Sequence, residues 1–290
     1  MSEIAQGSGF HRRRVGDVVV TTINDGMLDL PLGSMFGIEA EAASAMLQEA
    51  FCLPTPRPSV NAFLIQGNGA TVLIDTGVGN GMGPTLGHLQ AGLAAAGVAP
   101  GEVDAVLMTH LHPDHTGGLA SPAGEAVFPN AELVIAQSEA DFWLNEAVAA
   151  AAPEERKAYF AGAQAAVAPY RSRLRLFTGT GEVAPGIQAH PLPGHTPGHT
   201  GYLVTSGDAA LLIWGDVLHV QDVQLRRPEV GMVFDTDPEE ATRSRLRVLD
   251  MAAQDRLMVA GMHLHFPAFS HVRKLAEGYA LVPDAWSGTV

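Results

Sequence analysis

The stretch HLHPDH places four side chains that can bind a metal ion within six residues: His110, His112, Asp114 and His115. The aliphatic run DAVLMT directly before it predicts a buried strand, so the stretch lies on the loop at that strand's carboxyl end. The two leading histidines point the same way in extended backbone, and the proline then turns the chain. A catalytic zinc ion needs no more than three protein ligands, so four candidates in six residues suggest two ions.

Three later residues can complete such a centre. His195 lies in the turn GHTPGH before the run GYLVTS, Asp216 follows the run LLIWG, and His263 follows the run LMVAGM. Each comes directly after a glycine or one residue later, where a backbone without a side chain can approach an ion closely. The residue types alone leave two alternatives open, namely His199 in place of His195 and His265 in place of His263.

The order of these motifs, HLHPDH, GHTPGH, GD and a late GMH, resembles the metallo-β-lactamase superfamily. The resemblance extends from Asp75 in LIDTG to His263 and so covers most of the chain. It implies an α/β fold, a four-layer αββα sandwich of mixed β-sheets with the metal site at strand ends. More narrowly, segments 215–241 and 259–272 are similar to the methyl parathion hydrolases and their lactonase and aryl-esterase relatives.

The resemblance also implies a role for each ligand. One metal ion is held by His110, His112 and His195, the other by Asp114, His115 and His263, and Asp216 bridges the two. Three further residues are expected to orient these ligands from behind: Asp75, His199 and His219. Imidazole and carboxylate ligands without a thiolate suit Zn(II), Co(II), Mn(II) or Fe(II), and zinc is the default expectation for the two divalent ions.

Two ions about 3.5 to 4 Å apart can share a water and lower its pKa from about 15.7 toward 7, so a bridging hydroxide is the expected nucleophile. Asp216 is then catalytic as the bridge, and Asp114 can pass a proton to the leaving oxygen. The chain has no G-x-S-x-G motif, which removes the common serine-hydrolase route.

We therefore expect a dinuclear hydrolase that cleaves lactone or aryl ester bonds and also phosphotriesters. The alternatives are a glyoxalase II-like thioester hydrolase and an iron-dependent persulfide dioxygenase, although such dioxygenases use one iron and do not need the second ligand set. Phe36, Trp143 and Phe266 are expected to form an apolar mouth for a small, largely apolar ester substrate.

Composition restricts the partners. The chain of 290 residues is 47% hydrophobic and carries a net charge of -14, which disfavours nucleic acids and anionic membranes. Its single cysteine, Cys52, excludes an internal disulfide, and we expect it to be a small, buried, apolar side chain.

No signal peptide or membrane span is visible, so a cytoplasmic location is expected. An N-terminal arm and the apolar MFG loop suggest a homodimer.

The remaining pattern is one of alternating strands and helices. Short β-branched runs predict strands at 17–23, 61–66, 71–77, 104–110, 131–137, 201–206, 209–216 and 256–263. Alanine-rich segments predict helices at 85–96, 138–151, 154–168 and 238–253, the last with Asp237 as N-cap and Pro238 at the first helical position. The proline-rich segment 52–59 is expected to be a loop within one domain that spans residues 1–290.

Overall fold

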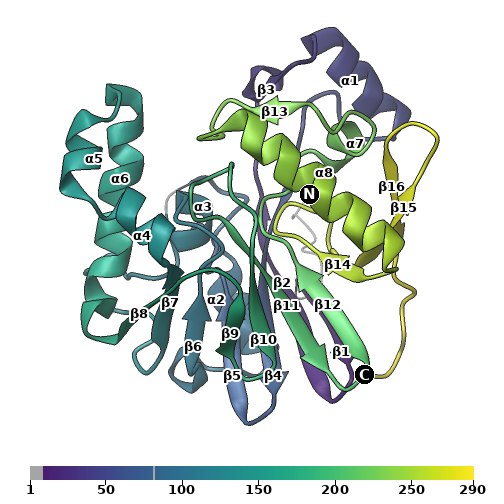
Figure 1. Cartoon of the computed structure of the whole chain (residues 1–290). Coiled ribbons are helices and arrows are strands. Elements are labelled where there is room, and N and C mark those ends of the chain that lie inside the picture. Colours follow the sequence, from purple (N-terminus) through teal and green to yellow (C-terminus); the bar gives the residue numbers. More distant parts are fainter. Residues whose placement is uncertain (1–8, 81) are drawn as a thin grey trace, which may run out of the picture.

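A computed structural model describes residues 9–80 and 82–290, and two seven-stranded mixed β-sheets dominate it (Figure 1). The first sheet has the order β1-β2-β4-β5-β6-β7-β8 and contains β1 (Phe10–Val15), β2 (Val18–Met27), β4 (Ser59–Gly67), β5 (Ala70–Ile74), β6 (Ala105–Leu107), β7 (Glu132–Ala136) and β8 (Leu174–Phe177). Its strands from β1 to β5 pair antiparallel and those from β5 to β8 pair parallel.

The second sheet has the order β16-β15-β14-β12-β11-β10-β9. Its strands are β9 (Gly181–Ala184), β10 (Ile187–Pro191), β11 (Thr200–Ser206), β12 (Ala209–Ile213), β14 (Met258–Ala260), β15 (Ser270–Lys274) and β16 (Tyr279–Pro283). Only β12 and β14 pair parallel, so their carboxyl ends meet at one edge. A small two-stranded sheet joins β3 (Met35–Phe36) to β13 (Gly231–Met232).

Helices cover the outer faces of both sheets (Figure 1). The helices are α1 (Ala40–Glu49), α2 (Leu89–Ala95), α3 (Pro113–Thr116), α4 (Gln137–Trp143), α5 (Glu146–Ala151), α6 (Glu154–Val167), α7 (Gln221–Gln224) and α8 (Pro238–Gln254). Residues of α2, α4 and α6 belong to the core on the outer side of the first sheet, and residues of α8 to the core that also fills the space between the sheets.

Strand β4 shows why the layers form. Phe63 and Ile65 pack into the core between the sheets, whereas Ala62 and Leu64 pack into the core under the helices. Successive side chains of a strand point to opposite faces, so a run that is apolar at every position needs cover on both sides. The predicted four-layer αββα sandwich is thus confirmed.

The eight predicted strands all form, but two helices differ from the prediction. The segment 138–151 is interrupted after Trp143, and Asn145 caps the second helix by accepting a hydrogen bond of 2.9 Å from the N–H of Ala147. Helix α2 begins only at Leu89, whose N–H donates to the buried carboxylate of Asp25. The predicted start of α8 is confirmed, since Asp237 accepts from the N–H of Glu240.

The N-terminal arm is only partly described. Residues 1–8 lie outside the described residues, and Phe10–Val15 form the edge strand β1 instead of a free arm. The homodimer stays a prediction.

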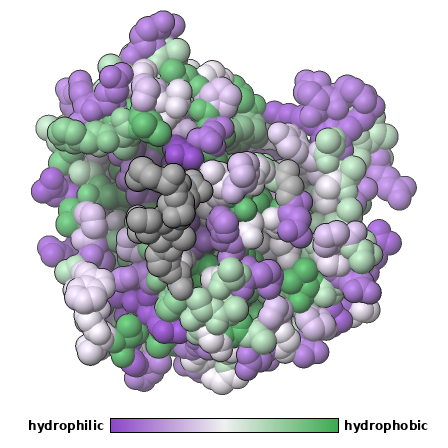
Figure 2. Space-filling view, turned by 180° about the vertical axis from the view of Figure 1, so that it is seen from behind, coloured by the Kyte–Doolittle hydropathy of each residue, from purple (hydrophilic) through white to green (hydrophobic). Residues whose placement is uncertain are grey.

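Among the described residues, no helix is both long and apolar enough to cross a membrane. On the face seen in Figure 2, hydrophilic and hydrophobic side chains are interspersed.

Candidate metal centre

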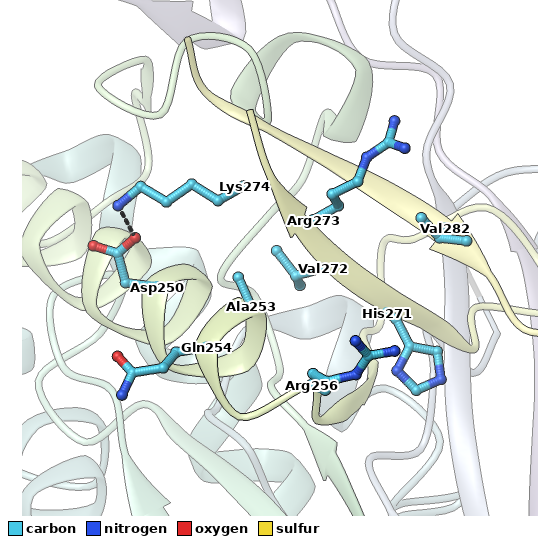
Figure 3. Close-up of a pocket in the computed structure, with 9 residues that line it drawn as sticks. All are labelled: Asp250, Ala253, Gln254, Arg256, His271, Val272, Arg273, Lys274 and Val282. Atoms are coloured by element: carbon cyan, nitrogen blue, oxygen red, sulfur yellow. Dashed lines mark hydrogen bonds and ion pairs between the residues drawn. The ribbon is translucent and has the colours of Figure 1, made fainter. Parts of the chain in front are cut away.

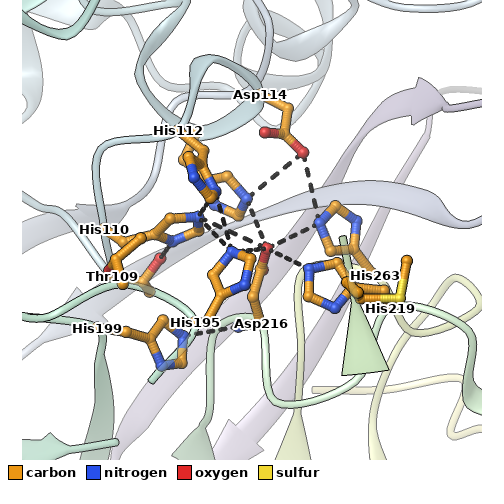
Figure 4. A network of polar contacts seen from close by, with 12 residues as sticks. Thr109, His110, His112, Asp114, His195, His199, Asp216, His219 and His263 are labelled. Atoms are coloured by element: carbon orange, nitrogen blue, oxygen red, sulfur yellow. Dashed lines mark hydrogen bonds and ion pairs between the residues drawn. The ribbon is translucent and has the colours of Figure 1, made fainter. Parts of the chain in front are cut away.

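The predicted ligands come from four loops that meet at one end of the sandwich. HLHPDH follows β6, His195 lies between β10 and β11, Asp216 follows β12, and His263 follows β14. The two sheets are joined at this end by a backbone hydrogen bond of 2.9 Å from the N–H of Thr200 to the carbonyl of Thr109. Residues that are up to 153 positions apart in sequence therefore face one small volume (Figure 4).

Three imidazole nitrogens form the first group. Nε2 of His110 lies 3.0 Å from Nδ1 of His112, Nδ1 of His112 lies 3.0 Å from Nε2 of His195, and the third side of the triangle is 3.2 Å. Ligands of one zinc ion in tetrahedral geometry are separated by about 3.3 Å when the Zn–N bonds are about 2.0 to 2.1 Å. The triangle therefore has the size of a metal-binding face.

Asp114, His115 and His263 form the second group. Oδ2 of Asp114 lies 3.5 Å from Nε2 of His115 and 3.4 Å from Nε2 of His263. Pro113 at the start of α3 turns the chain immediately after His112, so Asp114 and His115 lie on this helix whereas His112 is in extended backbone. The side chain of Asp114 is 14% exposed, more than that of either histidine.

One oxygen of Asp216 lies between the two groups. Its Oδ2 is 3.6 Å from Nε2 of His110 and 3.4 Å from Nε2 of His195, and it is 3.3 Å and 3.1 Å from Nε2 of His115 and His263 (Figure 4). A bridging ligand between two ions has to be within reach of both ligand sets. Asp216 occupies such a position.

The donor set fits divalent metal ions. Nε2 of His115 and Oδ1 of Asp216 are buried and have no hydrogen-bond partner in the part of the chain that the structure describes. Buried polar groups without partners are costly, and a metal ion satisfies such atoms. Five histidines and two carboxylates around one buried point are thus the chemistry of a divalent metal site.

The protonation states follow from the burial and charge of the cluster. Burial and neighbouring histidines lower the pKa of His110 and His112 well below its ordinary value, which keeps these imidazoles in the neutral form that binds metal. Burial opposes ionisation of Asp216, but His115 and His263 outweigh it and hold the pKa of Asp216 well below the usual range. The bridge position therefore carries a full negative charge.

Buried carboxylates and carbonyls fix the ligand rings from behind. Oδ2 of Asp75 lies 2.7 Å from Nδ1 of His115, Oδ1 of Asp235 lies 2.8 Å from Nδ1 of His195, and the carbonyl of Ser59 lies 2.8 Å from Nδ1 of His263. An acceptor at Nδ1 keeps the proton on that nitrogen and leaves Nε2 free for a metal. Asp235 was not among the sequence-predicted residues, and only its place within segment 215–241 signals it.

His199 does not join the metal-binding groups. Its Nε2 accepts a hydrogen bond of 2.8 Å from the backbone N–H of Asp216, and its Nδ1 lies 2.8 Å from the carbonyl of Leu192. Burial lowers the pKa of His199 to about 3, so the ring is a neutral acceptor. The structure thus places His195 in the cluster and His199 under the backbone of Asp216.

His219 contacts the cluster directly, although the sequence predicts that it orients a ligand from behind. Its Nε2 is 3.0 Å from Oδ2 of Asp216, and together with His195 and Asp216 it forms a further group with metal-ligand geometry. The side chain also lines the cavity above the cluster. The reason is that Asp216 and His219 lie on one short loop after β12, which turns both side chains inward.

Glu139 on α4 is a buried carboxylate that the sequence did not reveal. It accepts hydrogen bonds from the N–H of Leu111 (2.9 Å), the N–H of Gly198 (2.8 Å) and the hydroxyl of Thr196 (2.7 Å). One side chain therefore holds both the HLHPDH loop and the GHTPGH loop. Nothing in the local pattern of a helical glutamate predicts this role, because its partners come from loops distant in sequence.

A cavity of about 140 Å³ opens onto the cluster. Its walls combine residues of the centre with apolar side chains, namely Leu28, Leu30, Pro58, Met82, His112, Pro113, Asp114, Tyr159, Asp216, His219, Phe234 and His263. The phenylalanine ring of Phe234 lies 5.1 Å from that of His219, centroid to centroid. An apolar wall beside the metal-binding groups suits an uncharged substrate group.

The three aromatic residues expected at the mouth do not line this cavity. Trp143 is buried behind His112, with ring centroids 5.3 Å apart, because α4 directs it into the core. Phe36 pairs with Gly231 in the two-stranded sheet, where the missing side chain makes room for its ring. Phe266 is 39% exposed and its side chain lies outside the cavity wall. A substrate mouth formed by these three residues is therefore not part of this cavity and stays a prediction.

A larger cavity of about 670 Å³ lies elsewhere, between α8 and β15 (Figure 3). Lys274 there pairs with Asp250, and Arg256 and His271 line the same space. None of the residues that line it belongs to the cluster. Size alone therefore does not identify the site, and the convergence of ligands does.

Known proteins resemble the chain in sequence and in fold. The human protein "Metallo-beta-lactamase domain-containing protein 1" is 29% identical over 209 residues, which are 71% of this chain and 62% of that protein. An N-acyl homoserine lactonase of Bacillus thuringiensis is 24% identical over 169 residues, 58% of each chain. The chain thus matches less than two thirds of the length of these curated relatives.

Two solved structures match almost the whole chain. A crystal structure of hydrolase AbOPH in the beta lactamase superfamily is 30% identical, with a TM-score of 0.91 and coverage of 98% of this chain and 100% of that one. The dizinc quorum-quenching lactonase AidC, solved with the product N-hexanoyl-L-homoserine, is 26% identical with a TM-score of 0.91 and coverage of 97% and 99%.

The model of the metallo-beta-lactamase superfamily matches residues 55–263, which contain every predicted ligand. This range also holds β4 to β14 and the loops that carry the two metal-binding groups. The order of the motifs, the four layers and the matched range agree with one another. The chain belongs to the metallo-beta-lactamase superfamily.

Proposed function

We propose that this chain is a metal-dependent hydrolase that cleaves lactone or aryl ester bonds and holds two divalent ions, by default zinc. The position of Asp216 carries the proposal, since its Oδ2 is within 3.6 Å of imidazole nitrogens from both metal-binding groups. One ion per group with Asp216 as the shared ligand uses all seven predicted residues. The similarity to a dizinc lactonase over 97% of the chain supports the same assignment.

Two bound ions would supply a water ionised near neutral pH and a Lewis acid for the carbonyl or phosphoryl oxygen of a substrate. The protein's part is to orient the ligands. Asp75, Asp235 and the Ser59 carbonyl hold the Nδ1 protons of three ligand histidines, which points the Nε2 atoms at the shared volume. Both sheets contribute ligands, so the proposal treats residues 1–290 as one catalytic domain.

Asp114 is the proposed donor of a proton to the leaving oxygen. It lines the cavity, and its side chain is the most exposed among the second group at 14%. Burial opposes its ionisation, but His115 and His263 outweigh burial and lower the pKa of Asp114. The carboxylate is therefore ionised in the resting site and takes up a proton from the attacking water before it passes that proton on.

The cavity walls indicate the substrate class. Leu28, Leu30, Met82, Tyr159 and Phe234 offer apolar surface beside the ligands, and no lysine or arginine lines this cavity among the described residues. A neutral acyl or aryl group loses little on entering such a site, whereas a polyanionic group finds no cation of the protein to pair with. Small uncharged esters and lactones fit best.

The experiment combines metal analysis with initial rates on four substrates, a lactone, an aryl ester, a glutathione thioester and a neutral phosphotriester. We expect about two divalent ions per chain and the highest kcat/KM on the lactone or aryl ester. Removal of metal by a chelator should abolish turnover, and added Zn(II) should restore it. Turnover of the thioester alone would assign the chain to a different substrate class, and activity in fully metal-free protein would refute metal dependence.

A further inference from the structure

A second group of metal-binding side chains lies outside the centre. Cys52, Asp222 and His265 each offer one ligand atom, and these three atoms all lie within 4.8 Å of one another. They belong to the loop after α1, to α7 and to the loop after β14. None of the three is a ligand in the proposed hydrolytic centre. We propose that they form a separate site for a thiophilic divalent cation of the Zn(II) type.

The separations between the donor atoms match a tetrahedral site. Sγ of Cys52 lies 3.6 Å from Oδ2 of Asp222, and Nε2 of His265 lies 3.3 Å from the same oxygen. With Zn–S bonds of about 2.3 Å and Zn–N and Zn–O bonds of about 2.0 to 2.1 Å, tetrahedral ligands are about 3.3 to 3.5 Å apart. A cation can therefore be accommodated with small side-chain movements.

The backbone aims each side chain at this point. The N–H of Cys52 donates to the carbonyl of Leu47 at the end of α1, and Phe51 before it takes a left-handed φ of 59° that turns the chain. The N–H of His265 donates to the side-chain oxygen of Gln221 at 3.0 Å, which fixes the start of its loop against α7. Cys52 is thus positioned by the end of α1 and His265 by its contact with Gln221, and Asp222 lies on α7 next to that glutamine.

The three side chains lie at a cavity of about 290 Å³. Cys52, Asp222 and His265 line this cavity together with Arg57 and His219. The charge of Arg57 does not oppose a cation strongly, because its guanidinium is paired with Asp29 at 2.9 Å. A small molecule or water can therefore complete the coordination. His219 also lines the cavity above the hydrolytic centre, so the two sites are neighbours.

The environment of Cys52 differs from the sequence-based expectation of a buried apolar side chain. The thiol is only partly buried, and it contacts a carboxylate. Burial, followed by the charge of Asp222, raises the pKa of the Cys52 thiol, which makes it a poor free nucleophile. A metal ion reverses this, since coordination deprotonates a thiol and neutralises the adjacent carboxylate.

The mixed sulfur, nitrogen and oxygen ligands select the cation. A thiolate and an imidazole favour Zn(II) and Cd(II) over Mg(II) and Ca(II), which prefer oxygen ligands only. Bound there, the cation would link three segments that are 170 and 43 residues apart in sequence.

The test uses the fact that Cys52 is the only cysteine in the chain. Protein whose hydrolytic centre is already loaded with zinc is titrated with Cd(II), and the ultraviolet charge-transfer band of a Cd–thiolate bond is recorded. Cd(II) exchanged into the hydrolytic centre gives no such band, since its proposed ligands are nitrogen and oxygen atoms. We expect a band that saturates at one equivalent and is absent in Cys52→Ser.

Asp222→Asn and His265→Gln should each weaken this Cd(II) binding. Loss of a residue that only hydrogen-bonds to a metal ligand lowers metal affinity by roughly 10- to 100-fold, and loss of a ligand should cost more. His271→Gln, a histidine on β15 away from the group, is the matched control and should titrate like wild type. Absence of the band at excess Cd(II) would overturn the proposal, as would unchanged affinity in both ligand variants. Metal content of the hydrolytic centre, measured in every variant, separates this result from failure of the proposed function.

Discussion

His115 and Asp75 are joined by a contact of 2.7 Å between Nδ1 and Oδ2, and the opposite nitrogen of the same ring lies 3.3 Å from Oδ2 of Asp216. Asp75 is itself held by the N–H and the hydroxyl of Thr109, at 2.8 Å and 2.6 Å, and adopts a left-handed φ of 59°. A buried carboxylate thus sets the orientation of one proposed ligand from the far side of its ring.

Asp75→Asn tests this orientation. The amide keeps the shape but loses the charge that favours the Nδ1 proton of His115, so we expect metal affinity to fall by about 10- to 100-fold. Competition with a chromogenic chelator measures the change. Asp208→Asn, at an exposed turn, is the control and should bind like wild type. Equal affinity in both variants would mean that Asp75 does not act on the metal site.

Asp216→Ala removes the proposed bridge. We expect loss of the tightly bound metal pair, and a decrease in kcat/KM of about 1000-fold or more, since metal assistance is worth several kcal/mol. Metal content by atomic spectroscopy and rates on the preferred ester report the two effects independently. Near-normal metal content together with near-normal turnover would show that the bridge is elsewhere.

Metal binding should release protons. Burial acts to lower the pKa of His115, but the carboxylates of Asp216, Asp114 and Asp75 outweigh it and raise this pKa well above its ordinary value. In metal-free protein the ring therefore stays protonated to higher pH, and an incoming cation has to displace that proton. The affinity should accordingly rise with pH up to the raised pKa. Calorimetric titrations in buffers of different ionisation enthalpy count the protons, and a pH-independent affinity would contradict the expectation.

Glu139→Gln should destabilise the fold and weaken metal binding together. Glutamine offers one acceptor oxygen where two are used, and its amide nitrogen faces donors of Thr196 and Gly198. Loss of charge-assisted bonds in a buried site costs about 2 to 3 kcal/mol in the free energy of unfolding. Urea unfolding checks the value, with the exposed Glu146→Gln as control. A change below about 0.5 kcal/mol, which is the usual scatter of surface substitutions, would rule out the role.

Tyr159→Ala should raise KM for substrates with a long acyl or aryl group by about 10-fold, the equivalent of about 1.4 kcal/mol of lost apolar contact, with little effect on kcat. Phe36→Ala is the matched control, because Phe36 is similarly exposed, at 37% against 41% for Tyr159, but lies outside the cavity wall. Steady-state kinetics on short and long esters compare the two. The reverse result would place Phe36 at the substrate mouth.

Much of the fold could be predicted from the local sequence. The eight predicted strands form because each is an apolar, β-branched run that ends at glycine, proline or a polar turn. The edge strands β1, β8, β9 and β16 escaped prediction, as did β10 and β15 beside two of these edges, since their residues are only partly buried and lack that pattern. Helix α2 starts later than its composition suggests because the cap is a distant side chain, Asp25.

For the site, the sequence by itself determined most of the side chains that gather, although not His219 as a member of the cluster. The ligands of HLHPDH and those that follow glycines at strand ends are local features, and the order of strands brings such ends together. Only the tertiary structure decided which residues support these ligands and which residues line the cavity beside them. Glu139 and Asp235 contact the metal-binding loops at Leu111 and His195, which lie 28 and 40 residues away in sequence, and Tyr159 reaches the cavity from α6. His265 is separated from His263 because neighbouring residues on one loop face different cavities. The local sequence gives the type of a side chain and the direction in which the backbone presents it. Its contact partner depends on the packing of segments that meet only in the folded protein.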